Sequence, residues 1–212
     1  MDATLRRLSP LSGVIFAVLY FAGLLLAMKG SPEFVGKPAD IQSYYEGTTN
    51  HHVALGGFIA IVATPFWLLF LGNLRSAMGQ AEGGAGRLSA TAFGAGVAAA
   101  ATGTAGMFLN TVAALRGDQT GHINAAVATT LFDATQVLVY SATMALLSAF
   151  ALCVGVAAVR YGAVVPKWLG FIFIILAIPM VLPMISWAVL PLGLLLTVVL
   201  SIALYRQRAG EL

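Results

Sequence analysis

Polar side chains recur along one face of an otherwise apolar stretch in the second half of the chain. They fall three or four residues apart, which is the spacing of one side of an α-helix: Thr129, Asp133, Gln136, Tyr140 and Thr143. An ionisable group within a membrane helix is costly and by default marks a functional site. Three interpretations of this face remain open: a hydrogen-bonded network between helices, the polar rim of a ligand cavity, and a site coupled to protons or ions.

Asn110 is expected to lie level with this polar face. It follows Ala90, where its own apolar segment begins, by about 20 residues, which is roughly the number of helical residues that cross a bilayer core. The same depth on the next segment corresponds to Gln136 or Tyr140, one turn below Asp133. The sequence therefore predicts a candidate ligand-binding site around these four side chains.

A short helix is predicted over about 38–48, in the longest connection on the same side. Pro38 suits the first position of a helix, and Tyr44 and Tyr45 then share one face with Ile41. Tyrosines favour the level of the lipid headgroups, so we expect this helix to lie on the outer membrane surface. A structural cap is the favoured interpretation and a mobile lid is the alternative, with both tyrosines as candidate ligand-binding residues.

The three histidines, His51, His52 and His122, all fall in or beside connections on that side. His51 and His122 are further candidate ligand-binding residues. Adjacent histidines on a helix point about 100° apart and chelate one metal ion poorly, and the HExxH pattern is absent. Haem held between helices would need histidines within the apolar segments, which contain none, and Cys153 is the only cysteine. The sequence therefore predicts no metal, haem or other cofactor.

These side chains must be positioned by six apolar stretches, each long enough to cross a bilayer. Of the 212 residues, 59% are hydrophobic and 9% are charged, whereas about a quarter are charged in soluble domains. The predicted fold is all-α: a polytopic membrane protein with a single domain over 1–212, a bundle of six transmembrane helices. The predicted spans are about 11–28, 53–72, 90–115, 130–159, 168–186 and 188–205.

Basic residues alternate between the connections and orient the chain. Eight of the 11 lie at the two ends of the chain or in the second and fourth connections, and only Lys29, Lys37 and Arg116 lie in the others. Because basic residues favour the cytoplasmic side, both termini are predicted to be cytoplasmic, in the inner membrane of a cell. The first apolar stretch is expected to be a retained span rather than a cleaved signal peptide. The net charge of +3 is then explained by the basic residues that orient the chain in the membrane, and no nucleic-acid partner is expected.

Two of the spans have further features. The fourth is too long for the bilayer, so 129–136 should project toward or beyond the outer headgroups. The third carries small residues on one face, Ala95, Ala99, Thr102 and Gly106, which favour close contact between helices. This contact is expected within the chain, with a second copy or with a larger membrane complex.

Four local motifs resemble those of a broad family of small bacterial multi-pass membrane proteins of unknown function. They are Arg6-Arg7 followed by Pro10 and Gly13, Tyr44-Tyr45 followed by His51-His52, Phe70-Leu-Gly72-Asn73-Leu-Arg75, and Pro166-Lys-Trp168-Leu-Gly170. The resemblance covers most of the chain and implies six helices. It implies neither an activity nor a site.

No catalytic motif occurs; G-x-S-x-G, for example, is absent. We therefore favour a non-enzymatic protein that binds or helps to transport a lipid or a hydrophobic small molecule at the outer mouth of the third and fourth spans. Its partners would be membrane lipids. The alternatives are an accessory or scaffold subunit of a larger complex, and a membrane enzyme or metal or haem protein that uses the outer histidines and Asp133.

Overall fold

The computed structural model describes residues 9–46 and 50–210, and in this part of the chain it is all-α. Five helical segments are long and apolar enough to cross a membrane. Their helices are η1 and α2 (Ser9–Leu11, Ser12–Met28), α4 (Asn50–Glu82), α5 (Arg87–Thr120), the continuous run α6, η2 and α7 (Ala125–Gln136, Val137–Ala142, Thr143–Tyr161), and α9 (Pro183–Gly210). The two remaining helices are α3 (Pro38–Glu46) and α8 (Lys167–Met180). The protein is thus a multi-pass helical membrane protein.

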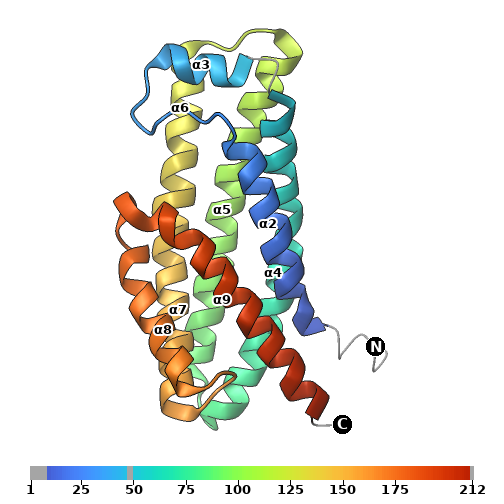
Figure 1. Ribbon diagram of the computed structural model, residues 1–212, viewed down its shortest axis with the longest axis vertical. Coiled ribbons are helices and arrows are strands. Elements are labelled where there is room, and N and C mark those ends of the chain that lie inside the picture. Colours follow the sequence, from blue (N-terminus) through green and yellow to red (C-terminus); the bar gives the residue numbers. More distant parts are fainter. Residues whose placement is uncertain (1–8, 47–49, 211–212) are drawn as a thin grey trace.

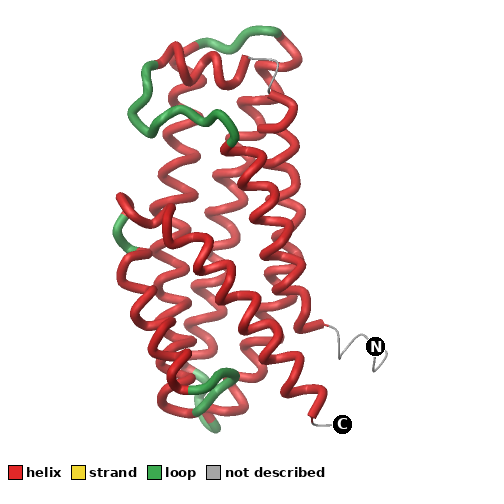
Figure 2. The backbone as a smooth tube through the Cα atoms, in the orientation of Figure 1, coloured by secondary structure: helices red, strands yellow, loops and turns green. Residues whose placement is uncertain are grey.

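The long helices run side by side, and α3 lies across one end of the bundle, which we call the α3 end (Figure 1). The start of α2, the end of α9 and the α4–α5 and α7–α8 connections lie at the opposite end (Figures 1 and 2). We call this opposite end the basic end. Its helix ends and connections carry Arg75, Arg87, Arg160, Lys167 and Arg206. The described chain therefore enters the bundle, at the start of α2, and leaves it, at the end of α9, at the same end.

Glycines let α2 and α4 approach at backbone distance. A Cβ atom on Gly23 would lie 2.6 Å from the carbonyl oxygen of Gly56, and one on Gly56 would lie 2.5 Å from that of Gly23. Lipid chains are as apolar as leucine, so helices in a bilayer associate through close packing and hydrogen bonds rather than by excluding water. A larger side chain at either glycine would force the two helices apart.

A second glycine pair joins α7 to α8. A Cβ atom on Gly155 would lie 2.7 Å from the Gly170 carbonyl oxygen, and one on Gly170 would lie 2.9 Å from that of Gly155. The small-residue face of α5 also packs within the chain. Thr102 Oγ1 lies 2.8 Å from Thr143 Oγ1, and Gly106 faces Val139.

One turn of π-helix, η2, interrupts the helix between α6 and α7. A π turn changes the direction of the side chains that follow and leaves carbonyl groups without their α-helical partners. Two hydroxyl groups supply new partners: Thr143 Oγ1 donates to the carbonyl of Leu138 (2.7 Å), and Ser186 Oγ on α9 donates to the carbonyl of Tyr140 (2.7 Å). Side-chain hydroxyl groups thus stabilise the π turn.

In the described part of the chain, five helical segments are long enough to span a membrane, whereas six spans were predicted. α8 occupies the predicted fifth span, but its 14 residues extend only about 21 Å, whereas the core of a bilayer is about 30 Å thick. The helix ends at Met180 because Pro183 begins α9 and disfavours helical backbone in the residue before it. The structure therefore places the break at 181–182, earlier than the predicted break at 187.

The fourth predicted span is longer than a bilayer core requires, and so are the two helices that precede it. α4 has 33 residues and α5 has 34, so each extends about 50 Å, well beyond a bilayer core. The predicted connection between them shortens accordingly, because α4 continues to Glu82, whose carboxylate accepts hydrogen bonds from the backbone amides of Leu88 (3.1 Å) and Ser89 (2.7 Å) at the start of α5.

The Gly23–Gly56 contact can be tested by adding one methyl group. We expect Gly56→Ala to lower the free energy of unfolding in detergent by about 3 kcal/mol, because the new carbon would meet the backbone of α2. Gly72→Ala on the same helix is the matched control, since nothing lies within 4 Å of its Cβ position. Equal thermal stability of the two variants would contradict the close contact.

The orientation of the bundle can be tested by labelling single cysteines. In a Cys153→Ala background, Val35→Cys places a thiol on the α3 side and Gly84→Cys places one in the α4–α5 connection; both sites are exposed. Because basic residues favour the cytoplasmic face, we expect a membrane-impermeant maleimide to label only Val35→Cys on intact cells. Labelling of Gly84→Cys alone would invert the predicted orientation.

Candidate ligand pocket

A small pocket lies near the α3 end, between α2 and the α6–η2 helix, with α5 and α3 completing its walls. Its volume of about 30 Å³ is room for roughly two water molecules. The polar lining consists of Ser31, Tyr44, Asn110, Thr135, Gln136 and Tyr140, and the apolar lining of Leu24, Ala27, Met28, Met107, Phe132 and Val139. We call this space the α3-end pocket. It contains four of the candidate residues: Tyr44, Asn110, Gln136 and Tyr140.

Two buried phenols attach α3 to the bundle beside this pocket. Tyr45 Oη donates to Asn110 Oδ1 on α5 (2.8 Å), and Tyr44 Oη donates to the carbonyl of Ala27 on α2. Burial raises the pKa of both phenols well above their usual 10, so they remain neutral hydrogen-bond donors. A helix therefore forms over Pro38–Glu46, and its tyrosine face packs on the protein; positions 47–48 of the predicted helix lie outside the described residues.

Only some of the side chains on the polar face of α6 make hydrogen bonds to other helices. Among the described residues Asn110 bonds to Tyr45 and not to α6. Thr135 Oγ1 shares its one hydrogen between the Leu131 carbonyl of its own helix (2.8 Å) and the Gly106 carbonyl of α5 (3.2 Å), so it links α6 to α5 through the longer of two contacts. Gln136 lines the pocket, and its amide makes no hydrogen bond within the described residues. Its polar atoms are therefore available to another molecule.

Tyr140 closes the pocket toward α2. Its hydroxyl lies 3.0 Å from the sulfur of Met28. A thioether is a weak acceptor, so this contact is readily exchanged for a stronger one. The α2 wall at Leu24, Ala27 and Met28 was missed by sequence reasoning, because its apolar residues look the same as those that face lipid.

Asp133 lies outside the pocket. It is half-buried on α6 and close enough to Tyr45 to interact with it electrostatically, but it does not line the pocket. Asn110, Gln136 and Tyr140, which the sequence places at one depth, line one pocket, whereas the carboxyl group expected beside them is not part of its lining.

Two of the three histidines take part in separate contacts at the α3 end, whereas the Nδ1 atom of His52 is buried without a hydrogen-bond partner among the described residues. His122 Nδ1 lies 2.8 Å from Glu46 Oε1, and His51 Nδ1 lies 3.6 Å from Asp118 Oδ1. The His51–Asp118 pair is largely exposed, and such pairs contribute little to stability. Among the described residues, no group of three or more His, Cys, Asp or Glu side chains is placed to hold a metal ion.

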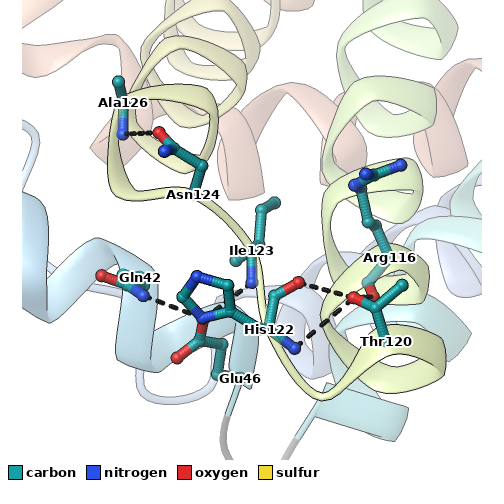
Figure 3. A network of polar contacts seen from close by, with 8 residues as sticks. All are labelled: Gln42, Glu46, Arg116, Thr120, His122, Ile123, Asn124 and Ala126. Atoms are coloured by element: carbon teal, nitrogen blue, oxygen red, sulfur yellow. Dashed lines mark hydrogen bonds and ion pairs between the residues drawn. The ribbon is translucent and has the colours of Figure 1, made fainter.

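Glu46 is the centre of the contact between α3 and the α5–α6 connection (Figure 3). Its Oε1 accepts hydrogen bonds from Gln42 Nε2 (2.9 Å) and from the Ile123 amide (2.7 Å), besides its contact with His122. These donors hold the pKa of the Glu46 carboxyl below its usual 4.5, with Gln42 the largest cause. The spacing of Gln42 and Glu46, four residues apart on one helix, was the available signal in the sequence.

The Glu46 contact predicts a pH-dependent anchoring of α3. Because the pKa is lowered in the folded state, the carboxylate stabilises the contact above the usual glutamate pKa, and this stabilisation is lost as the pH falls through the lowered value. We expect the Ile123 amide to be protected from hydrogen exchange near neutral pH and to lose protection below about pH 4.

Glu46→Gln should reduce the protection of Ile123 near neutral pH and remove its acid-dependent step. Glu33→Gln is the control, because Glu33 is exposed in the connection between α2 and α3. Protection that is unchanged in Glu46→Gln would show that Glu46 does not hold the α5–α6 connection.

No family model, curated protein or solved structure matches the chain. The resemblance drawn from the local motifs is therefore supported only at its coarsest level, a multi-pass helical membrane protein. The function has to be argued from the pocket itself.

Proposed function

We propose that this protein is a non-enzymatic membrane protein that binds a lipid or a hydrophobic small molecule, with the polar group of the ligand in the α3-end pocket. The observation that carries this proposal is the amide of Gln136, which lines the pocket without a partner in the described part of the chain. A polar group in a membrane helix is costly unless it is paired, and a ligand would pair it.

The chemistry of the lining selects a neutral polar group. None of the described lining residues carries a charge, and the donors and acceptors are amides, phenols and hydroxyls. An ionised headgroup would lose its hydration without gaining a counter-charge. A hydroxyl, ester or amide group satisfies the pocket, and its small volume holds only a few such atoms.

The position of the pocket supports entry from the bilayer. α2 packs mainly against α4, and α6 packs against α5 and α3, so the pocket lies where two sides of the bundle meet. Apolar side chains of α2 and α6 border it, including Leu24, Met28 and Phe132. We propose that an apolar chain lies along this border while its headgroup enters the pocket. With the basic end in the cytoplasm, the ligand comes from the outer leaflet of the inner membrane.

Native mass spectrometry with 1-oleoylglycerol, a neutral single-chain lipid, tests this proposal. Gln136→Leu removes the uncommitted amide and breaks no hydrogen bond that the structure shows. Because a neutral hydrogen bond contributes about 1 kcal/mol, we expect the variant to bind roughly five-fold more weakly than the unmodified protein.

The matched control is Gln119→Leu, at an exposed position near the end of α5. It should bind 1-oleoylglycerol as the unmodified protein does. Equal binding by Gln136→Leu, or no lipid adduct on any of the three proteins, would refute the proposed role of the pocket.

A further inference from the structure

A second and larger cavity lies in the middle of the bundle, among α2, α4, α5, α7, α8 and α9. Its volume of about 70 Å³ is several times what a single water molecule needs. We call it the central cavity. Five aromatic side chains contribute to its wall: Phe16, Tyr20, Trp67, Phe150 and Phe173. The indole of Trp67 already donates to the carbonyl of Gly96 (2.9 Å), so it offers the cavity only its ring.

Some hydroxyl groups in the wall donate to backbone carbonyls, and others have a hydrogen that is not used in a hydrogen bond. Thr143 donates to Leu138 and Thr197 donates to Gly193. Thr64 and Thr104 share one hydrogen bond of 2.8 Å, and the hydrogen of the second hydroxyl has no acceptor among the described residues.

Tyr20 supplies a further donor, because its hydroxyl has no hydrogen-bond partner in the part of the chain that the structure describes. Buried phenols usually do have such a partner.

Two glycines keep space open in front of these donors. A Cβ atom on Gly103 would lie 3.7 Å from Tyr20 Oη and 3.4 Å from Thr143 Oγ1, so an alanine would fit there and fill part of the cavity. A Cβ atom on Gly193, on the α9 side, would lie 3.0 Å from Met180 Cε, the far end of a flexible side chain. The cavity is therefore bounded by residues that tolerate small additions.

We propose that the central cavity is a second binding site, for a small neutral apolar molecule that carries a carbonyl oxygen. The oxygen accepts hydrogen bonds from Tyr20 and from the Thr64–Thr104 pair, and the remaining atoms contact the aromatic wall. No acidic or basic side chain among the described residues lines the cavity, so a charged ligand is excluded. This site does not depend on the α3-end pocket.

Trp67 provides a direct reporter of occupancy. The protein has three tryptophans, and Trp168 and Trp187 are both exposed at the surface (65% and 60%). In a Trp168→Phe, Trp187→Phe background, the remaining fluorescence comes from the cavity wall. Bromine quenches tryptophan on contact, so two small probes that match the size of the cavity are compared in detergent: 5-bromopentan-2-one, which has a carbonyl acceptor, and 1-bromopentane, which lacks one.

We expect the ketone to quench Trp67 at a concentration roughly 30-fold lower than the bromoalkane, which is the effect of two neutral hydrogen bonds. Tyr20→Phe removes a donor that has no partner in the described structure, and it should reduce this preference to about five-fold. The double variant Gly103→Ala, Gly193→Ala should weaken quenching by both probes.

Gly72→Ala, Gly94→Ala is the matched control, because nothing lies within 4 Å of either Cβ position and neither glycine lines the cavity. It should be quenched as the unmodified background is, and so should Gln136→Leu, which tests the other pocket. Equal quenching by the two probes, or quenching that survives in the Gly103→Ala, Gly193→Ala variant, would overturn the proposal.

Discussion

The close approach of α2 to α4 at Gly23 and Gly56 is the contact on which the α3 end depends. The Cβ position of Gly56 abuts the backbone of Ala27, and the carbonyl of Ala27 accepts the hydrogen bond of Tyr44. The same contact holds α2 in place as a wall of the α3-end pocket. In a bilayer the exclusion of water does not drive helices together. The absence of side chains at the two glycines therefore determines how closely α2 and α4 approach. A wider spacing between α2 and α4 would move the α2 wall and the carbonyl that anchors α3.

The π turn has a comparable effect on the other side of the pocket. Gln136, just before the turn, and Tyr140, within it, line the α3-end pocket, whereas Thr143, which follows the turn, lines the central cavity. Its cost in lost backbone hydrogen bonds is offset by hydroxyl groups on Thr143 and on Ser186 of α9. Because Ser186 comes from another helix, the geometry of the polar face depends on how α9 packs.

Part of this arrangement is readable from the sequence. Counting residues from the expected ends of the spans places Asn110, Gln136 and Tyr140 at one depth, because the rise of a helix is constant. The count cannot reveal partners: Asn110 bonds to a tyrosine 65 residues away, and Asp133 turns aside from the pocket. A π turn and a glycine pair have no local signature of their own, since both depend on the helix packed opposite. The central cavity was missed because single threonines among apolar residues look like ordinary helix surface.

The two cavities are separated by a layer in which Tyr20 and Tyr140 pack around Ala27, Ala60, Met107 and Val139. Each cavity has an uncommitted polar group at this level, Gln136 on one side and the Tyr20 hydroxyl on the other. Both side chains are half-buried, and an unpaired polar group destabilises a fold by about 1–3 kcal/mol where it is fully buried. Ordinary packing would remove that cost by replacing either side chain with leucine. The bundle instead retains both groups next to open space. On the function and the second site proposed above, a ligand at free concentration L that pairs either group would raise the free energy of unfolding by RT ln(1 + L/Kd), so thermal stability in detergent would rise with ligand concentration.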